Sequence, residues 1–418
     1  MTETFELDET LRASTQKQTL STLFASGLFA RAGMTLGFPI AALLIKDMLG
    51  SATFAGLSTV AITVGTAFSA KSISSYMNRR GRRPGLVAGY LIAAVGSGIA
   101  LLGAQMDSII IFLVGLVGIG VGSGASNLSR YAAADLALAD RKAKAISFIV
   151  FASTIGAVFG PTLVGPADRI GQSFGFDERA GVYVVTAVLF VVGAIIVGIR
   201  LRPDPLVLIG GLDSATSPER ANFTDSLRIM LAQPQTRLAL LSLVVSQAVM
   251  VGVMAMTPVH MEAHDHSDSI IGWVISAHVL GMFASAPLAG WAADRFGKMP
   301  SIAFGGFVLV LATTLTSLAG DAPKLLLFPG LYLLGLGWSF GMVAGSALLT
   351  ESVTATDRVS VQGAADLLAA IVSGVAALAS GIILTMTGYH ILSMIGIAAA
   401  GLLLVNGFTR TRQAALAI

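Results

Sequence analysis

Twelve apolar runs of about 20 residues dominate the sequence, and each is long enough to cross the roughly 30 Å hydrocarbon core of a bilayer as an α-helix. The predicted spans are 20–45, 53–76, 84–104, 108–137, 143–165, 180–200, 237–260, 269–292, 300–319, 323–350, 361–386 and 388–408. Only 12% of the residues are charged, whereas charged residues make up about a quarter of a soluble protein. The sequence therefore predicts an all-α polytopic membrane protein.

A polar interval at 201–236 divides these spans into two sets of six. We therefore expect two six-helix bundles, flanked by short tails. The predicted boundaries are a tail at 1–19, a first bundle at 20–200, a linker at 201–236, a second bundle at 237–408 and a tail at 409–418.

An internal repeat supports this division. Asn78–Pro84 resembles Asp294–Pro300 at a shift of 216 positions, and Gly118, Gly120 and Asp140-Arg141 have counterparts at a shift of 217. Basic cytoplasmic turns would explain the shared arginines but not the nearly constant shift over two separated segments. The pattern indicates duplicated, pseudo-symmetric halves of six helices each.

Lysine and arginine are unevenly divided between the two sides of the predicted membrane. With both termini in the cytoplasm, 19 of the 26 basic residues fall on the cytoplasmic side and four on the other. Because cytoplasmic loops carry an excess of Lys and Arg, we expect cytoplasmic N- and C-termini and a non-cytoplasmic loop at 261–268. The net charge is +3, but the basic residues are distributed according to the side of the membrane. A nucleic-acid partner is therefore not expected. The bilayer is the expected partner of a chain that we take to be monomeric.

Two segments resemble motifs of the major facilitator superfamily. Gly290–Lys298 follows the pattern Gly-x-x-x-Asp-Arg-x-Gly-Lys between the eighth and ninth spans, and Gly156–Pro161 is similar to the superfamily's Gly-Pro motif in helix 5. The resemblance covers essentially the whole chain and implies that fold, with transport by alternating access. It also implies gating by an acid at a helix N-terminus, which suits Asp294 better than Asn78, its counterpart in the first half.

Two finer motifs are similar to those of the CcoA-like copper importers, a branch of the superfamily in the bacterial inner (plasma) membrane. They are Met250-x-x-x-Met254 in the seventh span and His278-x-x-x-Met282 in the eighth. The resemblance implies that these four residues bind copper, which would be the transported substrate and not a cofactor. The same family contains a riboflavin-transporting relative, so transport of a small organic solute is the alternative.

The residues themselves also favour copper. Residues four apart share one face of a helix, so each motif offers two ligands pointing in one direction. Thioether and imidazole suit Cu(I) and suit Mg or Ca poorly, and the chain has no cysteine that could supply a thiolate. At 1.5 Å per residue the four side chains lie about 9 to 20 Å from the outer ends of their helices, near the midplane where such transporters bind substrate.

Ordinary packing is the competing interpretation of these motifs. Methionine fills gaps in apolar cores, and a Met-x-x-x-Met pair by itself favours packing over metal binding. An ionisable side chain inside a span is costly and marks a functional site, which shifts the balance at His278. A structural histidine bonded to a neighbouring carbonyl is the alternative there.

Five further Met and His side chains gather near the outer ends of the same two spans: Met256, His260, Met261, His264 and His266. One interpretation is a capture site that passes metal inward to Met254. The other is a solvated loop whose histidines have no role in transport.

Other polar residues predict a gate. Arg31 lies mid-span and is expected to face a central cavity, as a gate or as a contact for an anionic solute. Near the cytoplasmic ends we expect an ion-pair network that closes the inner side, formed by Arg130, Asp135, Asp294, Arg295, Glu351, Arg358 and Asp366. No acid stands mid-span, so proton coupling is not predicted. No nucleophile–base set or phosphate loop occurs in the sequence, so we expect neither an enzyme nor a resident cofactor.

Overall fold

The computed structural model describes residues 9–50, 54, 57–177, 179–210, 223–262, 264, 268–319 and 323–416, and no strand occurs in these ranges. The predicted all-α fold is confirmed. The first helices are α1 (Glu9–Leu49), α2 (Leu57–Arg80), α3 (Arg82–Gln105), α4 (Ile109–Asp135), α5 (Lys142–Thr162), α6 (Val164–Ser173), α7 (Val182–Arg200) and α8 (Pro205–Leu208). They are followed by α9 (Phe223–Ala232), α10 (Pro234–Glu262), α11 (Asp268–Val279), η4 (Leu280–Ala284), α12 (Ala286–Phe296), α13 (Lys298–Ser317), α14 (Pro323–Ser352) and α15 (Arg358–Leu416).

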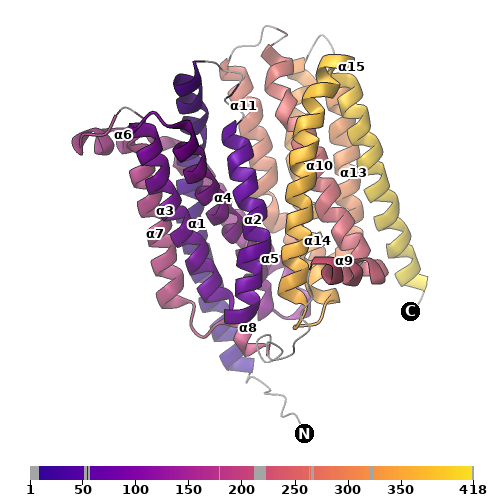
Figure 1. The fold of residues 1–418 in the computed structure, drawn as a ribbon. Helices are drawn as coiled ribbons and strands as arrows, with labels where there is room; N and C mark the ends of the chain where they lie inside the picture. Colours follow the sequence, from indigo (N-terminus) through magenta and orange to yellow (C-terminus); the bar gives the residue numbers. More distant parts are fainter. Residues whose placement is uncertain are drawn as a thin grey trace. The chain divides into compact units, whose positions relative to one another are not determined.

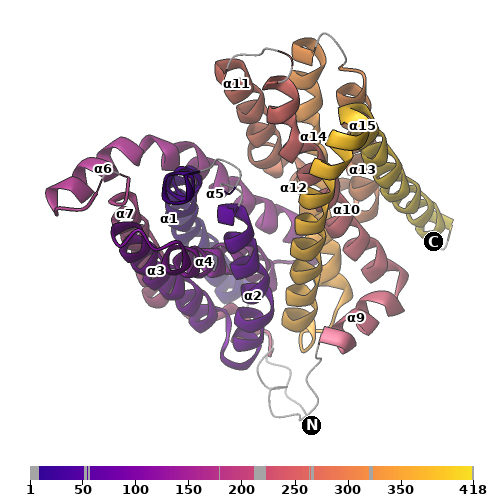
Figure 2. The ribbon, with the colours of Figure 1, turned by 45° about the horizontal axis from the view of Figure 1, so that its top comes forward.

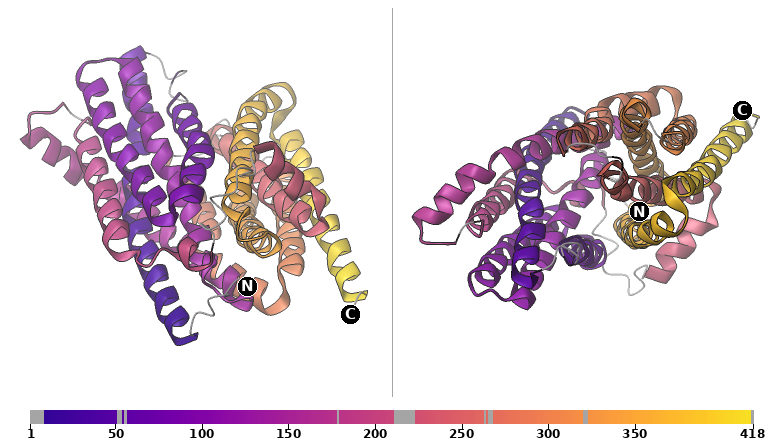
Figure 3. Two further views of the ribbon diagram at one scale, coloured as in Figure 1. Left: turned by 60° about the horizontal axis from the view of Figure 1, so that its bottom comes forward. Right: turned by 90° about the horizontal axis from the view of Figure 1, so that it is seen from above.

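Most predicted spans coincide with one of these helices or with part of one, whereas the span at 269–292 is divided among α11, η4 and α12, and the span at 143–165 ends in α6. Nine helical stretches in the described part of the chain are long and apolar enough to cross a membrane. One of them lies within α15, which has 59 residues and contains the last two predicted spans, separated by Gly388 with φ 85°. Glycine enters this left-handed region without steric cost, and the chain reverses there (Figures 1 and 3). The number of twelve spans stays a prediction.

The chain forms two compact units, Met1–Ala139 with Ile155–Arg220 and Asp140–Thr154 with Ala221–Ile418. The start of α5 therefore groups with the second unit, although the sequence analysis placed it in the first bundle. The polar interval at 201–236 also holds more structure than expected, because α8, α9 and the first turn of α10 lie within it. Similarly, α1 begins at Glu9 and α15 ends at Leu416, so both predicted tails are partly helical.

Small residues let the helices of the first unit approach one another closely. The α4 helix packs against α2 and α3, and α7 packs against α1 and α3. At the crossing of α3 and α4, a Cβ added to Gly96 would lie 2.7 Å from the Cα of Gly118. Close backbone contact through glycine is typical of helix pairs in membranes.

In the second unit, the elements that carry the predicted copper ligands all pack against α14. It packs against α10, α11, η4, α12 and α13, while α10 also packs along α15 (Figure 2). The short helix α9 lies across the ends of the long helices of this unit (Figure 1).

Candidate functional site

His278 is held by a hydrogen bond from α11 to α14. The side chain is 2% exposed, and its Nδ1 lies 2.9 Å from the carbonyl oxygen of Leu331. A carbonyl oxygen only accepts, so Nδ1 carries a proton, and in the neutral imidazole Nε2 keeps its lone pair. Within the described residues, this buried Nε2 has no hydrogen-bond partner. Anchoring of one ring nitrogen to a carbonyl is also how proteins orient histidines whose other nitrogen binds a metal.

Directly after α11 the helix widens into a π-helical turn, η4, which contains Met282. Pro287 near the start of α12 has no N–H to donate to the preceding turn, which is consistent with the break in α-helical bonding. A π turn holds more residues than an α turn, so residues four apart come closer to one line along the helix. The turn therefore aligns Met282 with His278 better than a regular α-helix would.

Glycines fix the crossing of this segment with α14. A Cβ added to Gly335 would meet the carbonyl oxygen of His278 and would lie 2.7 Å from the backbone nitrogen of Met282. A Cβ on Gly281 would in turn meet the backbone of Tyr332. The backbone of α14 thus sets the position of both His278 and Met282.

The methionine pair lies on α10. Like α11 and η4, this helix packs against α14. Met250 is buried and Met254 is half-buried. No three His, Asp or Glu side chains in the described ranges come together as a metal site. A metal site built from the described side chains of this unit would therefore need methionine sulphur among its ligands.

A hydrogen-bonded and aromatic layer lies beside both motifs, and the sequence analysis did not identify it. The Trp338 indole Nε1 on α14 donates to Gln247 Oε1 on α10 over 2.8 Å, one turn before Met250. The ring of Phe283 in η4 packs edge-on against Trp338, with centroids 5.8 Å apart. This layer ties together the three helical elements that carry or support the predicted ligands. Its one detectable sequence signal is Gln247, an amide inside a span.

The outer Met and His residues make packing contacts. The His260 ring stacks on Tyr389 with centroids 4.3 Å apart and an interplanar angle of 7°, and the Tyr389 hydroxyl lies 2.8 Å from Thr257 Oγ1. The exposed His264 has its Nδ1 2.8 Å from the carbonyl oxygen of His260. These contacts tie the outer end of α10 to α15.

The remaining members of the outer set are divided. Met261 is fully buried, Met256 is half-buried on α10, and His266 lies outside the described residues. The rings of His260 and His264 lie with their centroids 4.4 Å apart, while the stack on Tyr389 also explains His260 as a packing group. The capture site stays a prediction.

The predicted gating residues form contacts in both units. Asp135 at the end of α4 pairs with Arg82 at the start of α3, at 2.8 and 3.3 Å, and neither side chain is exposed. Arg82 was not among the predicted partners of Asp135. Arg130 donates to the Asn127 carbonyl and the Tyr131 hydroxyl. Arg31 is half-buried on α1, with Nη1 3.7 Å from the sulphur of Met34.

In the second unit, Asp294 accepts hydrogen bonds from the first backbone N–H groups of α5. Its carboxylate oxygens lie 3.1 Å from the Ala143 nitrogen and 2.8 Å from the Lys144 nitrogen. Lys298 lies 3.6 Å from Asp294 and 3.0 Å from Glu351. An acid at a helix N-terminus satisfies free N–H groups and complements the helix dipole. Of the other predicted members, Asp366 and Arg358 are half-buried and Arg295 is exposed.

Replacement of Asp294 by alanine is expected to loosen the start of α5. Two charge-assisted hydrogen bonds would be lost, at a cost of about 1.5–3 kcal/mol. The thermal unfolding midpoint of the purified protein should fall measurably below that of Asp225→Ala, which removes a carboxylate that pairs with the exposed Arg228. Equal midpoints for the two variants would contradict the anchoring role.

The sequence matches the family model of the Major Facilitator Superfamily over residues 23–268 and 238–415. It is 34% identical to the "Uncharacterized MFS-type transporter YddS" of Bacillus subtilis, over 93% of this chain and 89% of that protein. It is 30% identical to the "Riboflavin transporter RfnT" of Brucella anthropi, over 73% of each.

The fold is similar to the crystal structure of the human organic anion transporter MFSD10 (TETRAN). The TM-score is 0.76 at 16% identity, over 94% of this chain and 99% of that chain. At this identity the similarity concerns the fold alone. The all-helical transporter architecture expected from the repeat and the loop motifs is thereby confirmed.

Proposed function

Because the chain belongs to the major facilitator superfamily, and is therefore a membrane transporter and not an enzyme, we propose that it imports copper by alternating access. Copper would be the cargo, held by Met250, Met254, His278 and Met282. We place the protein in a bacterial inner membrane with both termini cytoplasmic, as the distribution of Lys and Arg indicates.

The observation that carries the proposal is the buried Nε2 of His278. Its lone pair lies inside the protein without a partner among the described residues, while Nδ1 is fixed to Leu331. A buried polar atom without a partner is costly, and a soft metal ion supplies a partner that matches imidazole and thioether ligands. Met282, in the π turn that follows, is the neighbouring sulphur ligand.

The second candidate function is transport of a small organic solute. The relative named as a riboflavin transporter supports it. Arg31 also supports it, because a cation within a span marks a functional position and suits a solute with an acidic group. In that case the Met and His side chains would only line the cavity.

Uptake by cells separates the two candidates. Cells that express the wild-type chain should accumulate more radiocopper than cells with an empty vector. The double variant Met250→Leu, Met254→Leu should lose most of this gain, because leucine keeps the volume but removes both thioether ligands. The matched control is Met386→Leu, Met394→Leu, whose methionines are exposed on α15, and it should transport like the wild type.

Riboflavin uptake is measured in the same cells. Equal radiocopper accumulation by the wild type and both double variants would exclude the copper proposal. A riboflavin gain that survives the loss of Met250 and Met254 would favour the second candidate.

A further inference from the structure

A pocket of about 490 Å³ lies at the end of the second unit where α9 crosses the long helices. Its apolar lining comes from three elements, with Leu227 and Leu231 on α9, Leu241 and Val244 on α10, and Leu368 and Val372 on the first limb of α15. The volume falls within the range of about 300–1,000 Å³ typical of ligand pockets. No predicted copper ligand lines it.

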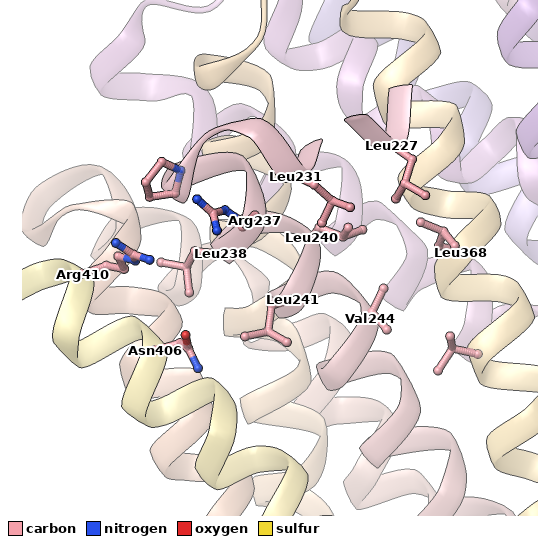
Figure 4. Close-up of a pocket in the computed structure, with 12 residues that line it drawn as sticks. Leu227, Leu231, Arg237, Leu238, Leu240, Leu241, Val244, Leu368, Asn406 and Arg410 are labelled. Atoms are coloured by element: carbon pink, nitrogen blue, oxygen red, sulfur yellow. The ribbon is translucent and has the colours of Figure 1, made fainter. Parts of the chain in front are cut away.

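The polar lining is gathered at one side. Figure 4 shows Arg237, Arg410 and Asn406 on one side of the pocket, and Leu227, Leu368 and Val244 on the other. The Arg237 side chain forms no ion pair or hydrogen bond with any described residue, and Arg410 Nη1 donates to the Gln413 amide oxygen over 2.9 Å. Neither guanidinium is thus neutralised by a carboxylate in the described part of the chain.

Contacts between α9 and α10 hold the walls of the pocket in place. The buried Thr236 hydroxyl donates to the carbonyl oxygen of Met230 over 2.8 Å, which ties the end of α9 to the start of α10. Ser226 and Met230 bury the inner face of α9. The angle between α9 and α10, and with it the shape of the pocket, is therefore fixed by the chain itself.

The surroundings indicate a membrane surface. On α9, Phe223 and Leu231 are 38% and 50% exposed, and the Arg228 side chain is 79% exposed and pairs with Asp225. An amphipathic helix of this kind lies at the level of the lipid headgroups. The Lys and Arg distribution assigns this end of the unit to the cytoplasmic side, where anionic lipids attract basic pockets between helices.

From this arrangement we propose that the pocket binds one anionic phospholipid of the cytoplasmic leaflet. Guanidinium groups pair well with phosphate oxygens, so Arg237 and Arg410 contact the headgroup phosphate. The leucine and valine wall between α9, α10 and α15 takes the first part of an acyl chain. The site is separate from the transport site, and it holds α9 against the transmembrane helices.

The test uses the purified full-length transporter in detergent with phosphatidylglycerol as the probe. Native mass spectrometry counts retained lipid, and thermal unfolding measures stabilisation by added lipid. The variant Arg237→Gln, Arg410→Gln removes both headgroup contacts. The variant Arg228→Gln, Arg412→Gln removes the same charge from exposed positions on α9 and α15 that do not line the pocket. Wild type and the second variant should retain phosphatidylglycerol, and the first should bind it at least about tenfold more weakly.

A third variant, Leu241→Trp, fills the pocket but leaves both arginines in place, and it should also lose the lipid. Unfolding midpoints without lipid confirm that each variant is folded. Equal retention by the two arginine double variants would overturn the proposal, as would equal stabilisation by phosphatidylethanolamine. Stabilisation of the same size by glycerol 1-phosphate would show a site for a soluble anion and would also overturn it.

Discussion

His278→Asn is expected to abolish copper uptake while the protein stays folded. The asparagine amide nitrogen can take the place of Nδ1 and donate to the Leu331 carbonyl, which now lies 2.9 Å from the ring. It offers no equivalent of the Nε2 lone pair. Loss of groups that merely orient a ligand costs about 10–100-fold in metal affinity, so loss of the ligand itself should reduce uptake by at least about 100-fold.

Two companion variants make this result decisive. His278→Ala removes the ligand and also the hydrogen bond to the Leu331 carbonyl, so it should lose uptake and about 0.5–1.5 kcal/mol of stability. His390→Asn changes a histidine on α15 whose Nδ1 lies 2.8 Å from Ser317 Oγ, and it should transport copper like the wild type. If His278→Asn retains uptake, the histidine is a structural group, as the packing interpretation holds.

Local properties of the sequence explain why the fold was predicted well. A span is defined by about 20 consecutive apolar residues, and no knowledge of partners is needed to find one. Predicted and observed ends differ by a few residues at most helices, such as 300–319 against Lys298–Ser317 for α13. The larger differences fall at the tails and at the linker. There, short amphipathic helices such as α9 are stabilised by tertiary contacts that the composition of the segment does not reveal.

The candidate ligands could be proposed from the sequence, but the contacts that hold them in place could not. The spacing of His278 and Met282 is written in the sequence, whereas the π turn between Leu280 and Ala284 is not. The hydrogen bond to Leu331 joins residues 53 positions apart, and only packing of α11 on α14 brings them together. The same limit applies to Gln247 and Trp338, which are 91 positions apart.

The ion pair of Asp135 is another contact between residues far apart in the sequence. Its disruption has the largest effect on stability that we expect. We expected an acid near the end of a span to pair across the cytoplasmic side, but Arg82 was not among the partners considered. Arg82 and Asp135 are 53 positions apart, and both side chains are fully buried. The composition of the loops could indicate a network of ion pairs on the cytoplasmic side, but it could not indicate that Asp135 pairs with Arg82.

Asp135→Ala is therefore expected to destabilise the first unit strongly. It would leave the Arg82 guanidinium buried with its carboxylate partner removed, which costs about 3–5 kcal/mol, a large part of a typical total of about 5–15 kcal/mol. The thermal unfolding midpoint of the purified protein measures the loss. Asp47→Ala is the control, because its pair with Arg179 is shorter, at 2.6 Å, but exposed, and exposed pairs contribute only about 0–1 kcal/mol.

The double variant Arg82→Met, Asp135→Leu separates the cost of an unpaired charge from the value of the pair. Replacement of both partners by apolar side chains of similar size is often neutral or stabilising, so this variant should unfold at a higher temperature than Asp135→Ala. If the double variant were as unstable as Asp135→Ala, the loss of the ion pair itself would explain the instability. Burial of Arg82 without Asp135 would then not be the main cost. A loss of stability by Asp135→Ala no larger than that of Asp47→Ala would contradict the role of Asp135 in stabilising the buried Arg82.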